Sequence, residues 1–144
     1  MNTLTLDIAN RLIAAAQAKG KELDLPPLGI AVLDAGGHLI ALQRQDGLSF
    51  MRVQICQAKA YGALGMGVDS AALAARYEQG PSSVGFLGGV QMMFGGRLIP
   101  VAGGVLIRNA EGTVLGALGI SGAKSEQDAD CARVAITSVG LHHA

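Results

Sequence analysis

Two basic side chains in the segment 49–66 are the first candidates for chemistry in this sequence. Arg52 and Lys59 are seven residues apart, so in a helix they lie on one face. Small residues around them would let a ligand approach closely. Lys59 could give a pocket a positive charge or a proton, and it is therefore the candidate catalytic residue. The alternative is that both stems lie along apolar surface with their charged ends in solvent.

The second candidate is a loop at the end of a predicted strand. Ser121 and Gly122 end an apolar run in which glycine recurs, and their backbone amides could bind an anion. The alternative is a purely structural helix start, with Ser125 as N-cap, Asp128 completing a capping box and Glu126 favouring the helix dipole. Because the two carboxylates already occupy the positive end of this helix, a carboxylate or neutral carbonyl ligand is favoured over a phosphate.

The helices that must position these residues follow from hydrophobic periodicity and capping signals. Four helices are predicted, each with a candidate N-cap. They are 3–20 with Thr3 or Thr5, 49–66 with Ser49, 69–79 with Asp69, and a last helix that begins at Ser125.

Two hairpins are predicted between the helices, with turns at residues 34–37 and 109–112, where Asp, Asn and Gly suit tight turns. Residues 80–100 hold six glycines and two prolines and are predicted to be irregular, with one short strand. The order of elements predicts an α+β domain with an antiparallel sheet of about five strands, which helices cover on one face or on both.

Composition limits the classes of function. Eleven basic residues balance eleven acidic ones, and only 15% of the 144 residues are charged, which disfavours nucleic acid and membrane partners. The length suits one domain over residues 1–144, and the lack of a leader-like segment predicts a cytoplasmic protein. Cys56 and Cys131 are predicted to be buried thiols. Because half the chain is hydrophobic, we expect a homo-oligomer.

Three blocks of the sequence carry a family resemblance. They are IAVLDAGGHLIALQRQDG at 30–47, QAKAYGA at 57–63 and VAGGVLIRNAEGTVLGALGISGAKSEQDADCARVAI at 101–136. Together they resemble the haem-binding or haem-degrading GlcG-like family, which includes HbpS, and they are similar to the C-terminal part of some corrinoid adenosyltransferases. The likeness covers nearly the whole chain.

The resemblance implies a profilin-like fold with helices on both faces of the sheet, assembly into homo-oligomers and haem as ligand. Some members of the family are encoded beside small-molecule catabolic enzymes. It favours Lys59, which lies in the second block, over Arg52. It also places Gly103 and Gly104 near the expected pocket, in a block that reads GGVPI in the family. Here Leu106 replaces that proline, which frees a backbone N–H, so the ligand's identity does not carry over with the block.

A haem iron needs an axial ligand, usually His, Met, Cys or Tyr. His38 follows the first hairpin turn and is the candidate, although a histidine at a turn is more often simply exposed. The other candidates are Met92, Met93, Tyr61 and Tyr77. The apolar segment 86–94 could cover a flat macrocycle.

Two functions therefore remain open. The first is a binding protein for haem or a related tetrapyrrole. The second is a cofactor-independent enzyme acting on a small carboxylate or carbonyl metabolite, with Lys59, Arg97 and the amides of Ser121 and Gly122 around its ligand. The sequence contains neither a nucleophile elbow nor a dinucleotide-binding motif, so it does not favour a serine hydrolase or a dinucleotide-dependent enzyme.

Overall fold

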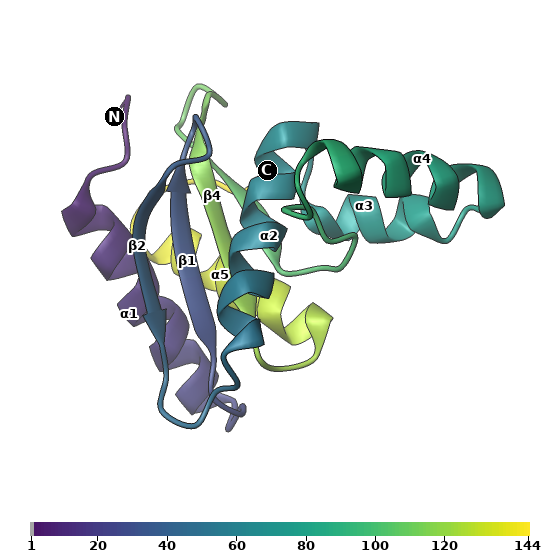
Figure 1. Cartoon of the computed structure of the whole chain (residues 1–144). Helices are drawn as coiled ribbons and strands as arrows, with labels where there is room; N and C mark the ends of the chain where they lie inside the picture. Colours follow the sequence, from purple (N-terminus) through teal and green to yellow (C-terminus); the bar gives the residue numbers. More distant parts are fainter. Residues whose placement is uncertain (1) are drawn as a thin grey trace.

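The predicted hairpins and helices build one antiparallel sheet with helices around it. A computed structural model describes residues 2–144 of the chain (Figure 1). The helices are α1 Leu6–Glu22, α2 Met51–Met66, α3 Ser70–Tyr77, α4 Pro81–Met93 and α5 Ser125–Ser138. The strands are β1 Gly29–Asp34, β2 Leu39–Arg44, β3 Gly104–Arg108 and β4 Val114–Ser121. The α+β prediction is confirmed.

Both hairpins form where the turn residues predict them. β1 pairs with β2, β3 pairs with β4, and the two hairpins join through antiparallel pairing of β1 with β4. The sheet order is β2-β1-β4-β3. Within residues 2–144 the sheet has four strands rather than about five, because the segment predicted to add a short strand is helical.

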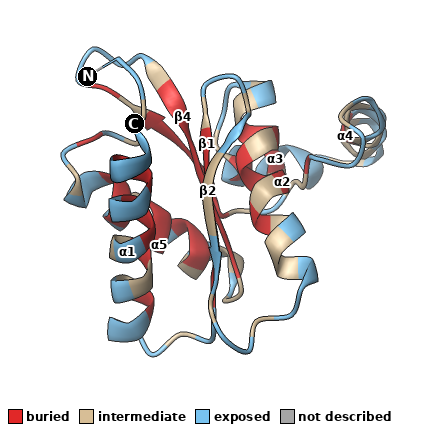
Figure 2. Cartoon of the chain, turned by 60° about the vertical axis from the view of Figure 1, so that its left-hand side comes forward, coloured by how far each residue is buried: buried red, intermediate tan, exposed pale blue. Residues whose placement is uncertain are grey.

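Helices cover both faces of the sheet, as predicted, and Figure 2 shows the two layers. Alternate strand residues point to α1 and α5 on one side and to α2 on the other, following the twofold repeat of a strand. The α1/α5 side includes Leu12, Ile13, Ile30, Val32, Leu118, Ile120, Cys131 and Ile136. The α2 side includes Leu33, Ala60, Ala63, Leu106 and Ala117.

Helix α2 lies unusually close to the sheet because glycines face it. A Cβ atom at Gly119 would collide with the carbonyl of Cys56, and one at Gly104 would collide with the backbone of Lys59. Only glycine leaves room for this approach. The close contact brings Lys59 and Cys56 against the strands, and both are buried.

The helix starts were predicted with mixed success. Thr5 caps α1, where its hydroxyl accepts a hydrogen bond from the Ile8 N–H at 3.2 Å. The prediction for Ser49 is wrong, because Phe50 occupies the N-cap of α2 and no side chain caps it. Asp69 does occupy the N-cap of α3, but its carboxylate accepts from the Leu106 N–H of β3 instead.

The prediction that Ser125 caps the last helix is also wrong. Ser125 is the first residue of α5, and Lys124 occupies the N-cap. The Lys124 N–H donates to Oε1 of Gln127 at 3.2 Å. Asp128 is therefore not the partner of a Ser125 cap, and its carboxylate is used in the interior.

The prediction of an irregular segment over 80–100 is wrong for its first part, where α4 forms. Pro81 lies at the first position of this helix, where its missing N–H costs nothing. Leu87 packs with Leu73 and Leu98 in a small cluster apart from the main core. Helices α3 and α4 form an arm that extends away from the sheet (Figures 1 and 2).

None of the helices in residues 2–144 has the length and apolar character needed to span a bilayer.

Candidate functional site

Two clusters of polar residues lie against different faces of helix α2. The first, which we call the ion-pair cluster, consists of Lys59, Asp128, Arg52 and Ser121. The second, which we call the Tyr61 pocket, is a cavity beside Tyr61. The two groups differ in burial and in the partners of their polar atoms.

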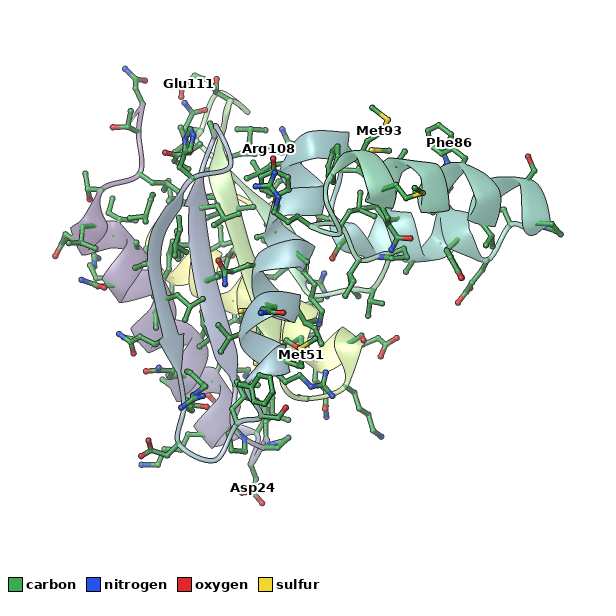
Figure 3. All side chains as sticks on the ribbon, viewed as in Figure 1. Asp24, Met51, Phe86, Met93, Arg108 and Glu111 are labelled. Carbon is green, nitrogen blue, oxygen red and sulfur yellow. The ribbon has the colours of Figure 1, made fainter. Side chains whose placement is uncertain are left out.

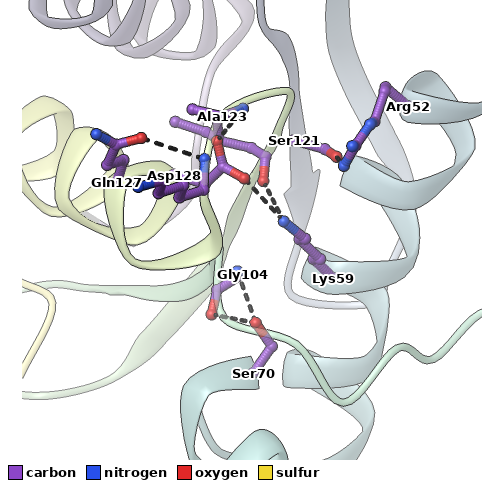
Figure 4. Close-up of polar contacts among 10 residues, drawn as sticks. Arg52, Lys59, Ser70, Gly104, Ser121, Ala123, Gln127 and Asp128 are labelled. Carbon is purple, nitrogen blue, oxygen red and sulfur yellow. Dashed lines mark hydrogen bonds and ion pairs between the residues drawn. The ribbon is translucent and has the colours of Figure 1, made fainter. Parts of the chain in front are cut away.

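In the ion-pair cluster, Lys59 reaches from α2 to the end of β4 and the start of α5 (Figure 4). Its Nζ donates to the carbonyl of Ile120 at 2.9 Å and to Oδ2 of Asp128 at 3.1 Å. The other carboxylate oxygen of Asp128 accepts from the Ala123 N–H at 3.0 Å. Lys59 is 1% exposed and Asp128 0%. The pair therefore ties three elements together inside the protein.

Burial sets the direction of both pKa shifts in this pair. Desolvation lowers the pKa of Lys59 and raises the pKa of Asp128, because it penalises each charged form. The opposite charge of the partner counteracts each shift. Hydrogen bonds from Lys59 and from the Ala123 N–H offset the cost of removing the Asp128 carboxylate from water. A buried ion pair is stable only when such contacts are present.

The predicted ligand loop at the end of β4 packs within the protein. Ser121 is fully buried, and its hydroxyl accepts from Nη1 of Arg52 at 3.3 Å. Gly122 has a φ of 143° and lies so close to the carbonyl of Pro27 that a side chain would not fit. Gly103 similarly lies against the Lys59 side chain, where a Cβ atom would be 2.8 Å from Nζ.

The structure thus places Arg52 against Ser121, and Lys59 against Gly103 and Gly104, through direct contacts. Gly122 packs against Pro27 instead. Glu126 lies apart and is exposed on the first turn of α5. Arg97 also lies apart, and it lines the Tyr61 pocket.

The Tyr61 pocket has a volume of about 460 Å³, which lies in the usual range for small-molecule sites. Its lining comes from α2, from the first hairpin and from the loop after α4. The lining residues are Leu33, Gly37, Leu39, Gln54, Gln57, Ala58, Tyr61, Gly95, Gly96 and Arg97. One part of the wall is apolar, and the other offers amides and a guanidinium.

Aromatic contacts hold the polar end of this pocket. The guanidinium of Arg97 lies over the Tyr61 ring, 4.1 Å from its centroid, in cation–π geometry. Phe94 meets the same ring edge-on, at 5.6 Å between centroids. Gly37 completes the enclosure, because a Cβ atom there would be 2.9 Å from the ring. Arg97 is thereby oriented while remaining exposed.

His38 does not line the Tyr61 pocket, although its neighbours Gly37 and Leu39 do. It lines a different groove instead, which it shares with residues 2–4. Its side chain is 82% exposed, and its Nδ1 lies 3.3 Å from Oδ1 of Asp34.

Sequence reasoning missed Gln54 and Gln57 as pocket residues. With Tyr61 they lie at spacings of three and four on one face of α2, which is a helical stripe visible in the sequence. The polar character of two glutamines did not distinguish them from ordinary surface residues.

The chain was compared with known proteins. Residues 4–137 match the family model described as "Haem degrading protein HbpS-like". The chain is 32% identical over 135 residues to an uncharacterized 15.0 kDa protein in the dhaT-dhaS intergenic region of Citrobacter freundii, a match that covers 93% of this chain and 90% of the relative. It is 28% identical over 139 residues, 96% of its length, to the corrinoid adenosyltransferase PduO of the same organism, but spans only 40% of that longer protein.

Among solved structures, the chain resembles the PduOC:heme complex with a TM-score of 0.85 and 25% identity, over 98% of both chains. The predicted resemblance is thus confirmed in sequence and in fold. The family model covers nearly the whole chain, including the hairpins, α2 and the start of α5. This chain belongs to the haem degrading protein HbpS-like family.

Proposed function

We propose that this protein binds haem or a related tetrapyrrole in the Tyr61 pocket. The observation that carries the proposal is the pocket's division into an apolar wall and an oriented guanidinium. A tetrapyrrole with acid side chains presents the same division, a flat apolar ring and peripheral carboxylates. The likeness to the PduOC:heme complex supports the choice of ligand class.

Arg97 would hold a carboxylate of the ligand through charge-assisted hydrogen bonds, for which its planar fork is suited. Leu33, Leu39 and Ala58 would contact the ring. Among the lining residues, Tyr61 has the side chain type that can ligate haem iron, and the bound iron would supply whatever redox chemistry follows. Gln54 and Gln57 would serve as hydrogen-bond partners at the rim.

The enzymatic alternative on a small carboxylate has less support. It placed Lys59 and the amides of Ser121 and Gly122 around a ligand, but Lys59 is buried against Asp128. Among the residues that line the Tyr61 pocket, only Tyr61 and Arg97 have ionisable side chains. A pocket with one cation and one phenol suits binding better than proton transfer near neutral pH.

A haem titration followed by absorbance tests the proposal. The wild-type protein should give a saturable, shifted Soret band at one haem per chain. Arg97→Gln should weaken binding about tenfold to a hundredfold, as expected for a lost charge-assisted hydrogen bond. Tyr61→Phe should alter the spectrum of the bound haem, because it removes the oxygen without changing the ring.

The matched control is Arg11→Gln, which removes an exposed guanidinium from α1 on the other side of the sheet. This variant should bind haem as the wild type does. An unshifted Soret band with wild-type protein would refute haem binding, and equal affinities of the Arg97 and Arg11 variants would refute the pocket.

A further inference from the structure

One face of α2 continues from the Tyr61 pocket to an exposed phenyl ring at the start of the helix. The α2 residues that line the cavity are Gln54, Gln57, Ala58 and Tyr61. Phe50 precedes them by four, seven, eight and eleven positions, which are the spacings of one helix face. Phe50 has helical φ and ψ of −64° and −27°, so the repeat extends to it. Its side chain therefore continues the stripe that lines the pocket, one turn beyond Gln54.

The ring of Phe50 is left in solvent, unlike those of the other phenylalanines. Phe50 is 72% exposed, the highest value among the five aromatic residues. Phe86 has Arg76 over its ring, and Phe94 packs edge-on against Tyr61. Across residues 2–144, the structure gives Phe50 no ring contact and no cation–π contact. This ring is therefore free to contact a ligand.

The position of Phe50 also leaves the helix without a side-chain cap. Phe50 occupies the N-cap of α2, and no side chain accepts a hydrogen bond there. Serine, threonine, asparagine or aspartate is preferred at this position, because its side chain binds a free amide of the first turn. Met51 follows and is 51% exposed, and Figure 3 shows it at the end of α2 far from the arm. Large apolar residues at an exposed helix start, where local rules favour a small polar one, are typical of a functional surface.

The Tyr61 pocket is shorter than a tetrapyrrole that lies along α2. Tyr61 and Gln54 are seven residues apart, which corresponds to about 10 Å at the rise of an α-helix. The guanidinium of Arg97 lies over Tyr61, at one end of this stretch. A macrocycle with its acid side chains is longer, so a ligand held at Arg97 has its opposite edge beyond Gln54. That edge reaches the turn that carries Phe50.

We propose that Phe50 determines the specificity of the Tyr61 pocket by packing on the apolar edge of the tetrapyrrole, opposite the carboxylates that Arg97 holds. This inference rests on the proposed function. The phenyl ring shields that edge from water and adds an aromatic contact to the buried area. A carboxylate at the same edge would lose water against the ring, and Arg97 is the only cationic residue of the lining. The protein therefore selects tetrapyrroles with acid groups on one edge, such as haem, over those with acid groups on both edges.

Parallel absorbance titrations with haem and with iron coproporphyrin III test this inference. The second probe carries propionates at the two positions where haem has vinyl groups. The wild type should bind haem more tightly than iron coproporphyrin III, by about tenfold or more. Phe50→Lys should reduce this preference by about tenfold, because it removes the apolar contact and supplies a cation to the additional carboxylates. Phe50→Ala should weaken haem binding by about tenfold through loss of the ring contact alone.

The matched control is Phe86→Lys, which adds the same charge at the other exposed phenylalanine, on α4. It should leave both affinities unchanged, and circular dichroism should show all variants folded. If the wild type shifts the Soret band of neither porphyrin, the proposed function fails and this inference fails with it. If the wild type binds haem but has no preference between the porphyrins, the role of Phe50 alone is overturned. An unchanged preference in Phe50→Lys, or an equal change in Phe86→Lys, overturns that role as well.

Discussion

The two groups of polar residues beside α2 differ in what they do: the ion-pair cluster joins elements of the fold, and the Tyr61 pocket is the proposed binding site. Lys59 and Tyr61 are two residues apart and lie on different faces. Lys59 is enclosed between β4 and α5, and its Nζ is hydrogen-bonded to Ile120 and Asp128. Tyr61 lines an open cavity together with the guanidinium of Arg97 and the amides of Gln54 and Gln57.

The difference arises from what lies opposite each face. The glycines of β3 and β4 let α2 pack directly on the sheet, so a charge there must find an internal partner. Opposite Tyr61 the chain presents a hairpin edge and the loop after α4, which leave space. A charged residue near a glycine-rich strand end is therefore ambiguous from sequence, because close packing and ligand binding favour the same residue types.

The largest effect should come from breaking the buried pair on one side only. Asp128→Ala leaves the Lys59 charge without its counter-ion in a site where Lys59 is 1% exposed. We expect the free energy of unfolding to fall by about 3–5 kcal/mol, measured by urea denaturation. Haem affinity of the folded fraction should stay unchanged, because Asp128 does not line the Tyr61 pocket.

Two further variants separate the charge from the packing. Asp128→Asn keeps an acceptor for the Ala123 N–H and removes the charge, so it should destabilise less than the alanine variant. Replacing both partners, Lys59→Met with Asp128→Leu, should recover most of the lost stability. If Lys59→Met alone lowered haem affinity at unchanged stability, the assignment of Lys59 to a structural role would fail.

The next effect concerns Leu106, which stands where the resemblance led us to expect a proline. Leu106 donates its N–H to Oδ1 of Asp69 at 2.9 Å, across the outer edge of β3. Leu106→Pro removes this donor and part of a buried side chain, and it should cost about 1–3 kcal/mol of unfolding free energy. In an Asp69→Ala background the same change should cost less, because the acceptor is already gone. If the losses of unfolding free energy from Leu106→Pro and Asp69→Ala were additive, the hydrogen bond between Leu106 and Asp69 would not be stabilising.

Local signals in the sequence were sufficient for much of this fold. Both hairpins follow from turns in which Asp34 and Asn109 accept from following amides. A threonine cap before the first amphipathic stripe also follows, although only the structure chooses Thr5 over Thr3. These signals act within a few residues, so they need no knowledge of the rest of the chain. The same holds for the alternation that places apolar strand residues on two faces.

Other features depend on contacts between distant segments. From the sequence alone, Asp128 is predicted to be a capping residue. In the fold it pairs with Lys59, which is 69 residues away in the sequence. Helix α4 has three glycines in its interior, so helix propensity argues against it, and an apolar cluster with α3 stabilises it. The Tyr61 pocket joins α2 to Arg97 through a ring contact that spacing alone does not reveal.

A smaller effect should appear at alkaline pH and concerns Cys56, on the face of α2 that packs against the sheet. Burial raises the pKa of the Cys56 thiol from 9.0 to about 12, and its Sγ donates to the carbonyl of Val53. Above pH 9 the unfolded chain releases this proton and the folded chain keeps it, so stability falls as pH rises through this range. Between pH 9 and 10 the wild type should lose about 1 kcal/mol more than Cys56→Ala, measured by urea denaturation at each pH. Parallel losses would mean that the thiol is not held protonated.

The smallest effect should come from Ser125, at the edge of the ion-pair cluster. A serine N-cap is worth about 1 kcal/mol, but Ser125 is the first residue of α5, and the cap position belongs to Lys124. The Lys124 N–H is satisfied by Gln127 and the Ala123 N–H by Asp128. Ser125→Ala should therefore change the free energy of unfolding by less than about 0.5 kcal/mol, as for an ordinary surface position. Gln127→Ala, which removes a side chain that does bond to the helix start, should cost more. If the ranking were reversed, Ser125 would be the true cap, and the start of α5 would differ from the one described by one residue.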